Sequence, residues 1–302
     1  MPDHLSVGRQ AGDTGYFGRP GGLPLDQAED DACSLLFETA VLDAPVQILG
    51  KARISLDIRL SERRSIIVIR LSDVAPNGEV SRVCFAVKNL ALDCDFLPRN
   101  PAPGKQAFRE TITFPNSAHR FAAGHKIRVA ISTSYWPLIW PSPHISQLLV
   151  NPDTANFELP CRKTRGEDSV PFTLAEKKLE ANPAQRPTGI ERVQIEDPDG
   201  DSIRHRWNNP FTEVEYAELG LVFGAQTSAE YQLSYRDPAS AQSSFEHRLQ
   251  TRYHDHEVCV IGRASLSSSA THYYPQVSIR VWLDNAEFFS RDWSCSIERK
   301  YS

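Results

Sequence analysis

The chain has 302 residues, which at roughly 150 residues per domain suits one large domain or two ordinary ones. Hydrophobic residues make up 40% and charged residues 24%, a composition that excludes wholesale disorder. The net charge of −5 supplies no basic field for nucleic acid or an anionic membrane. The sequence shows neither an apolar run long enough to span a membrane nor a signal-peptide pattern at its start. We therefore predict a cytoplasmic protein.

Six cysteines are scattered along the chain without a CxxC pair or a short ligand spacing. In a chain of this length such cysteines predict reduced thiols rather than a disulfide scaffold or a zinc ribbon. They are Cys33, Cys84, Cys94, Cys161, Cys259 and Cys295.

The N-terminal part is rich in glycine and proline, which predicts a connector arm over residues 1–32 rather than the start of a core. Within it, residues 26–32 have the composition of one or two helical turns, with Asp26 as a candidate cap.

The strand pattern begins after this arm. Residues 54–60 alternate between apolar and polar side chains, which predicts a half-buried strand. Residues 66–71 form an almost unbroken apolar run, typical of a strand covered on both faces. Asn77-Gly78 then predicts a hairpin into a second apolar run at residues 80–87.

Two further strands are predicted at residues 108–114 and 127–131, joined across residues 122–124. Several short strands separated by turn residues indicate a β-sandwich over residues 33–160. The whole chain is predicted to be all-β, with helix content well below the average of roughly one third.

The composition changes over residues 161–187, where charged residues cluster and no long apolar stretch occurs. A short helix is expected at residues 174–179. We interpret this segment as a linker to a second antiparallel β domain at residues 188–302, closed by a tight turn at Asp284-Asn285. Its strands are expected at residues 214–223, 229–235, 244–253, 257–266, 273–283 and 287–297.

Catalytic and cofactor motifs are missing from the sequence. No G-x-S-x-G elbow occurs, and Gly262-Arg263-Ala264-Ser265 lacks both its spacing and its context. The phosphate-binding G-x-x-x-x-G-K-[ST] and the dinucleotide motif G-x-G-x-x-G are also absent. We therefore name no catalytic residue and expect no cofactor.

Two clusters resemble metal sites only weakly. His254 and His256 would share one face of a strand, with His247 or Cys259 as a third ligand, but a solvent-facing pair is the better interpretation. Residues 197–201 place three carboxylates at alternate positions without the glycine and glutamate spacing of an EF-hand. This second cluster is interpreted as a polar turn.

Residues 135–141, with the sequence YWPLIWP, combine three large aromatics with two prolines. The prolines exclude an inner strand or a regular helix, so the segment is a loop whose apolar surface must be buried. Packing onto the chain's own sandwich and docking to a partner or ligand remain the two alternatives. The residues of the candidate docking or ligand surface are Tyr135, Trp136, Leu138, Ile139 and Trp140.

Three stretches together resemble one known family. Residues 118–132 read AHRFAAGHKIRVAIS, residues 30–40 read DDACSLLFETA, and residues 68–78 read VIRLSDVAPNG. They are similar to the carboxy-terminal jelly-roll (galactose-binding-like) domain of the Xaa-Pro dipeptidyl-peptidase and cocaine-esterase-like (acyl esterase) serine hydrolases, over about residues 25–160. Residues 270–273 and 289–293 are similar to an extra carboxy-terminal domain of some larger members.

In that family the catalytic serine, aspartate and histidine belong to an α/β-hydrolase domain that precedes the jelly roll, and nothing in this sequence matches that domain. The resemblance thus implies the non-catalytic back half of a peptide or acyl-ester hydrolase, inactive alone, as an excised fragment, the product of a split gene or a degenerate relative. Its partner would be the α/β-hydrolase domain, in cis or in trans, and a homo-oligomer is also considered. The stretch at residues 136–143 departs from the usual asparagine-rich segment and leaves the substrate undetermined.

A second hypothesis is a free-standing β-sandwich that binds a carbohydrate or another small ligand, with Tyr135, Trp136 and Trp140 stacking on a sugar. A third is a purely structural or interaction protein.

Overall fold

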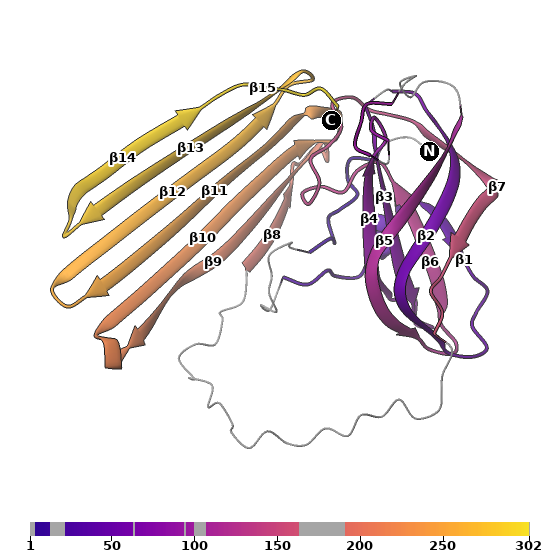
Figure 1. Ribbon diagram of the computed structural model, residues 1–302, viewed down its shortest axis with the longest axis horizontal. Helices are drawn as coiled ribbons and strands as arrows, with labels where there is room; N and C mark the ends of the chain where they lie inside the picture. Colours follow the sequence, from indigo (N-terminus) through magenta and orange to yellow (C-terminus); the bar gives the residue numbers. More distant parts are fainter. Residues whose placement is uncertain are drawn as a thin grey trace, which may run out of the picture.

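The computed structural model describes residues 4–12, 22–62, 64–93, 95–99, 107–162 and 191–301. Antiparallel strands dominate this part of the chain and form two units, a two-sheet sandwich and one large sheet (Figure 1). The predicted all-β architecture, a β-sandwich followed by a second antiparallel β domain, is confirmed.

The sandwich consists of a four-stranded and a three-stranded sheet in which all neighbouring strands are antiparallel. The first sheet has the order β1 (Leu35–Glu38), β6 (Lys126–Ser132), β3 (Ile66–Val74) and β4 (Val80–Asn89). The second has the order β5 (Phe108–Phe121), β2 (Val46–Leu60) and β7 (Leu148–Glu158). A short helix, α1 (Ala28–Ala32), precedes β1. Its N-cap is Gln27 and not the predicted Asp26, although the Asp26 carboxylate accepts a hydrogen bond of 2.9 Å from the Ala28 amide.

The main core lies between these two sheets, and the alternation in β2 explains it. Ile54, Leu56 and Ile58 point inward and are buried, whereas the residues between them are more exposed. Strand β3 is buried along its whole length, as its apolar run predicts. Its inward side chains join the core, while Ile66 and Val68 pack on the other face.

The hairpin predicted at Asn77-Gly78 joins β3 to β4 as expected. Gly78 adopts a φ of +90°, a backbone conformation that side chains rarely tolerate, and the Glu79 amide donates to the Asn77 side chain at 3.1 Å. The turn over residues 122–124 also forms, but it joins β5 and β6 across the sandwich because those strands lie in opposite sheets.

The second unit, here called the large sheet, is an antiparallel meander in which all strands but the last pair with their neighbours in the chain. The meander and the turn at Asp284-Asn285, where both residues have positive φ, are confirmed. The elements are β8 (Glu191–Glu196), β9 (Ser202–Tyr216), the 3-10 helix η2 (Ala217–Leu219), β10 (Leu221–Ser234), β11 (Asp237–Tyr253), β12 (His256–Ser268), β13 (His272–Leu283), β14 (Ala286–Ser294) and β15 (Ile297–Glu298).

The strand predicted over residues 214–223 is wrong. The chain reverses there through η2, and Gly220 adopts a left-handed φ of +60° that ends β9 and starts β10. Strands β8 and β9 were not predicted. Most of their residues are polar or charged, and neither strand contains a long apolar run.

The N-terminal arm contributes to the core, which corrects the expectation that it only connects. Leu5, Val7 and Ala11 are buried, at 3%, 0% and 0% exposure. They belong to two clusters that lie outside the main core of the sandwich. Glycine and proline content therefore indicated irregular backbone correctly but said nothing about burial.

Most of the predicted linker, with its expected helix at residues 174–179, lies outside the described residues. The cysteines in the described part, namely Cys33, Cys84, Cys161, Cys259 and Cys295, are free thiols. No helix among the described residues is long and apolar enough to cross a membrane.

Candidate functional site

The aromatic loop that follows β6 lies between the sandwich and the large sheet, and its first two side chains point to different units. Tyr135 packs with Val7, Val68 and the neighbouring Phe85 of the sandwich, with ring centroids of Tyr135 and Phe85 5.2 Å apart. Trp136 instead enters a cluster with residues of the large sheet. The loop thus connects the two units through adjacent residues.

We call the cluster around Trp136 the junction. Its buried members are Leu5, Trp136, Ile203, Leu233 and Ala241, and Trp140, Tyr231 and Tyr235 pack against them. Aromatic contacts extend it: the Trp136 ring lies 5.4 Å from Trp140 and 6.1 Å from Tyr231, centroid to centroid. The Trp140 indole also donates a hydrogen bond of 3.1 Å to Ser268 of β12.

These contacts bury much of the loop for which the sequence left a docking or ligand surface as one of two alternatives. The five residues predicted for it were Tyr135, Trp136, Leu138, Ile139 and Trp140, of which the first two are buried and the other three half-buried. The surface that buries Trp136 and Trp140 belongs to this chain's own large sheet. Neither of the two predicted alternatives named that unit, because its junction residues lie more than 60 positions further along the sequence.

The N-terminal arm is fixed beside the loop by one carboxylate. Asp30 of α1 accepts hydrogen bonds from the backbone amides of Gly8, Arg9 and Gln10, at 3.0, 3.2 and 3.3 Å. Asp30 lies 3.7 Å from the fully buried guanidinium of Arg70 in β3. Burial raises the pKa of Asp30, and the Arg70 charge opposes that shift.

Gly8 is required where the arm meets the loop. Its φ is +118°, and a Cβ at this position would lie 2.2 Å from the carbonyl oxygen of Trp136. The two segments approach so closely that the Trp136 amide donates to the Val7 carbonyl at 3.0 Å. Only glycine satisfies both the backbone conformation and the space.

Arg9 joins the arm to the large sheet. Its guanidinium donates to the Tyr235 hydroxyl at 2.6 Å and pairs with Glu196 at 2.5 Å, while its other end pairs with Glu29 of α1 at 2.9 Å. Burial raises the pKa of Tyr235 to about 12, so the hydroxyl stays protonated at neutral pH. One arginine therefore links α1 to the large sheet.

The C-terminal segment closes the junction from the other side. Arg299, at 2% exposure, donates to the Pro141 carbonyl at 2.8 Å and to the Ser269 carbonyl at 3.0 Å. Its guanidinium carbon lies 4.6 Å from the centroid of the Tyr273 ring. The junction is thus held by apolar packing, by the arm and by the returning C-terminal segment.

Three residues from the stretches that resemble the family also meet in the sandwich. Asp73 of β3 lies between two histidines, with its carboxylate oxygens 2.8 Å from Nε2 of His119 and 2.8 Å from Nδ1 of His125. The contacts tie together β3, the end of β5 and the turn before β6. The sequence contained the three residues but offered no local signal that they would meet.

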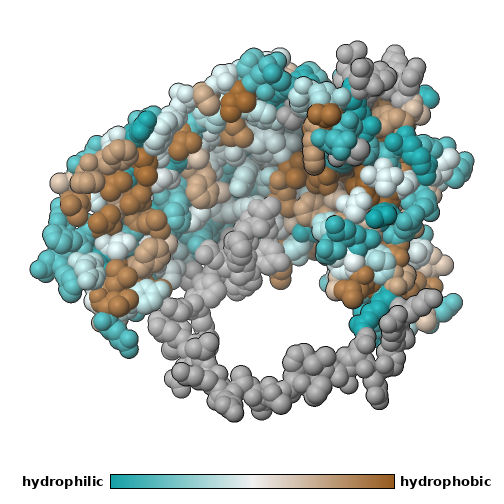
Figure 2. Space-filling model, in the orientation of Figure 1, coloured by the Kyte–Doolittle hydropathy of each residue, from teal (hydrophilic) through white to brown (hydrophobic). Residues whose placement is uncertain are grey.

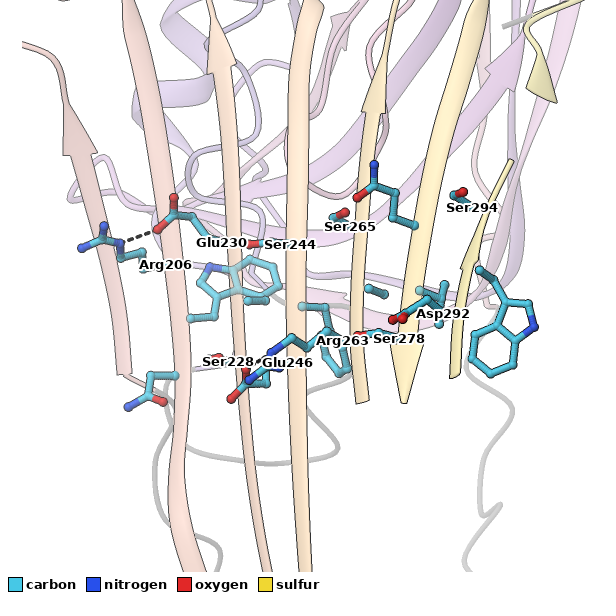
Figure 3. Close-up of a pocket in the computed structure, with 18 residues that line it drawn as sticks. Arg206, Ser228, Glu230, Ser244, Glu246, Arg263, Ser265, Ser278, Asp292 and Ser294 are labelled. Carbon is cyan, nitrogen blue, oxygen red and sulfur yellow. Dashed lines mark hydrogen bonds and ion pairs between the residues drawn. The ribbon is translucent and has the colours of Figure 1, made fainter. Parts of the chain in front are cut away.

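The large sheet carries a groove of about 930 Å³. It is lined by three consecutive residues from each of six strands, β9 to β14, and Figure 3 shows their side chains arranged in rows across the strands. The middle row, Trp207, Ala229, Phe245, Ala264, Val277 and Trp293, belongs to one face because directly paired residues project to the same side. We call this the apolar face of the large sheet.

The rows on either side project to the opposite, polar face, since successive residues of a strand alternate. Cross-strand ion pairs follow this arrangement, with Arg206–Glu230 and Arg263–Glu246 both at 2.6 Å. The apolar face continues into the junction, because Tyr231 and Leu233 follow Ala229 at alternate positions of β10.

The histidine cluster does not have the strand geometry that the metal interpretation assumed. His254 lies in the β11–β12 turn with a φ of +52°, and His256 starts β12 with its Nδ1 2.9 Å from Asp284, which raises the pKa of His256. His247 instead contacts Thr227 at 2.7 Å. No group of three metal-ligating side chains occurs in the described part of the chain.

The acidic segment at residues 197–201 is a polar turn between β8 and β9, as predicted. The Gly200 amide donates to the Asp197 carbonyl at 2.8 Å, and Gly200 has a φ of +69°.

The sandwich and the attached sheet place the chain among all-β proteins built from antiparallel sheets. Residues 3–168, more than half of the chain, match the family described as the X-Pro dipeptidyl-peptidase C-terminal non-catalytic domain. The chain belongs to this family, as its motifs predict. No curated protein matches it.

Several solved structures are similar to part of the chain. An α-amino acid ester hydrolase is 24% identical over 46% of this chain and 27% of its own, with a TM-score of 0.42. An aminopeptidase from the marine sediment archaeon Thaumarchaeota archaeon is 18% identical over 43% and 26%, with a TM-score of 0.38. A CocE/NonD family hydrolase from Staphylococcus aureus is 11% identical over 46% and 32%, with a TM-score of 0.33. This chain therefore spans only about a third or less of the length of these proteins.

Proposed function

We propose that this chain is the non-catalytic β portion of a serine hydrolase that cleaves peptides or acyl esters. The family match carries the proposal, because it names a C-terminal domain that is itself non-catalytic. The absence of a G-x-S-x-G elbow from the sequence agrees with it. In this role the chain forms one side of the substrate cleft and orients an α/β-hydrolase domain, which is supplied in cis or in trans.

The junction supports a positioning role. Trp136 packs between the two units, and Arg9 and Arg299 add polar contacts there. With these contacts the sandwich and the large sheet act as one rigid unit rather than as two loosely tethered domains. We propose domain limits of residues 33–160, with the jelly-roll topology of the family, and 188–302. We also propose a cytoplasmic location, where the free thiols stay reduced.

The first test measures activity of the chain alone. The purified chain is incubated with Xaa-Pro p-nitroanilides and with aryl esters, and separately with a fluorophosphonate probe. We expect hydrolysis at background and no stoichiometric labelling, because nucleophile, base and oxyanion hole act as one unit. Stoichiometric labelling of a serine would overturn the proposal.

The second test supplies the proposed partner. An α/β-hydrolase domain encoded beside or within the same gene is expressed with and without this chain. We expect the two to co-purify and hydrolysis of the Xaa-Pro anilide or aryl ester to depend on this chain. Equal activity of the hydrolase domain by itself contradicts the positioning role. A saturable change of tryptophan fluorescence with one sugar of a panel would favour the binding-module alternative.

A further inference from the structure

The two edges of the large sheet differ. At the β8 edge, the N-terminal arm and residue 23 contact side chains of the strand: Gln194 donates to the Arg9 carbonyl at 2.7 Å and Arg192 to the Leu23 carbonyl at 3.2 Å. Arg9 also pairs with Glu196 at the end of β8. The N-terminal arm therefore contacts part of this edge, although four of the six β8 residues are exposed.

At the other edge, β14 has no neighbour beyond β13 in the described part of the chain. All nine of its residues are exposed, and it contains neither proline nor lysine, although Glu287, Arg291 and Asp292 are charged. The only register irregularity with β13 falls between Val281 and Trp282, so residues 289–294 keep a regular extended backbone. A row of backbone N–H and C=O groups thus faces outward along this strand.

Apolar side chains gather along the same edge. Phe288 is 72% exposed, and Phe289, Trp293 and the adjacent Val277 of β13 are each more than 40% exposed. Figure 2 shows hydrophobic residues collected over this free end of the large sheet. Because Trp293 and Val277 lie on the apolar face, the patch continues the surface that Trp136 and Trp140 already cover at the junction.

We propose that β14 is the pairing site for a second copy of this chain, which adds its own β14 antiparallel across a two-fold axis. An outward row of peptide groups is satisfied best by another extended strand, and a two-fold arrangement satisfies both copies with one surface. A register centred on Ser290 sets Phe289 opposite Arg291 of the second copy and brings no like charges face to face. Aromatic and cationic side chains in directly opposed positions attract each other.

The test compares two substitutions on the apolar face of the full chain. Phe289, at 43% exposure, lies on β14, whereas Phe245, at 44% exposure, lies on β11 in the middle of the sheet. Sedimentation velocity over a range of concentrations measures dimerisation of the wild type, Phe289→Lys and Phe245→Lys. We expect a wild-type dimer, a dissociation constant raised at least about tenfold in Phe289→Lys, and little change in Phe245→Lys.

A wild-type chain that stays monomeric at all concentrations overturns the proposal. Equal weakening by both substitutions also overturns it, because stacked apolar faces rather than paired edges would then form the dimer. Circular dichroism of each variant checks that the sheet is intact.

Hydrogen exchange provides a second measurement that does not depend on a variant. We expect amides of residues 286–294 to exchange more slowly in the dimer than after dilution to monomer, whereas amides of β8 do not change. Protection of β14 that appears only after addition of an α/β-hydrolase domain would assign the edge to that partner instead and contradict the proposal.

Discussion

Trp136 of the sandwich meets Tyr231 of the large sheet edge to face, with ring centroids 6.1 Å apart. This contact turns an aromatic loop that would otherwise expose apolar surface into the joint between two β units. Edge-to-face geometry is favourable for aromatic pairs because the positive ring edge meets the negative face. The unfolding behaviour of the whole chain should therefore depend on this loop.

Replacing both Trp136 and Trp140 with alanine should uncouple the two units. Loss of a buried tryptophan typically costs about 3–5 kcal/mol, and here the loss falls on the junction rather than on the main core. We expect a single cooperative melt to split into two transitions, measured by calorimetry. Phe223→Ala, at a 38% exposed position of the large sheet, should keep the single transition. Identical melts for wild type and the double variant would show that the junction does not couple the units.

The substitution Gly8→Ala tests the contact between arm and loop. Its Cβ would lie 2.2 Å from the Trp136 carbonyl, so arm or loop must shift. Gly78→Ala is a matched control, because Gly78 also has positive φ, but a Cβ added there would have no atom within 4 Å. We expect Gly78→Ala to cost about 1–2 kcal/mol from backbone strain alone, and Gly8→Ala clearly more. Urea denaturation measures both, and equal losses would argue against a close contact.

Asp30→Asn tests the charge that holds the arm. The substitution removes one of the two buried carboxylates next to Arg70 and leaves only that of Asp31. Breaking a buried ion pair typically costs about 3–5 kcal/mol. We expect lower stability in urea and faster proteolysis within residues 4–12. Glu29→Gln removes an exposed ion pair with Arg9 and should change stability by less than about 1 kcal/mol. An arm that resists proteolysis equally in both variants would contradict the anchoring role of Asp30.

Stability should fall in acid because of His205, which is 1% exposed in the large sheet near the arm. Burial, together with the charges of Arg192 and Arg9, lowers its pKa from 6.5 to about 4. The unfolded chain therefore binds a proton at a higher pH than the folded chain does. The contribution of neutral His205 to the free energy of unfolding is fully present above pH 6.5. It is lost as the pH falls toward 4, and the loss amounts to up to about 3 kcal/mol.

The His205→Gln variant checks this pH dependence. Urea denaturation at several pH values between 4 and 7 should give a flatter profile for the variant than for the wild type. A wild-type profile that His205→Gln leaves unchanged would rule out His205 as the titrating group.

Local sequence patterns were sufficient to predict much of the sandwich. The alternation at residues 54–60, the apolar run at 66–71 and the Asn77-Gly78 turn all appear as predicted. Each of these signals depends on side-chain period or on turn chemistry within a few residues, so it can be read without knowing what packs above it. The same holds for the three stretches that resemble the family, because each of them is contiguous in the chain.

The sequence was less informative where burial depends on a distant partner. It predicted that the apolar surface of residues 135–141 must be buried, but Trp136 is buried by Ile203, Leu233 and Ala241 of the other unit. In its described residues the arm carries three buried apolar side chains, too few to form a periodic pattern. Its position depends on three backbone amides that converge on Asp30. Backbone groups carry no sequence signal, and contacts between distant segments exist only after both have folded. Tertiary structure alone therefore decided that the aromatic loop joins the two units.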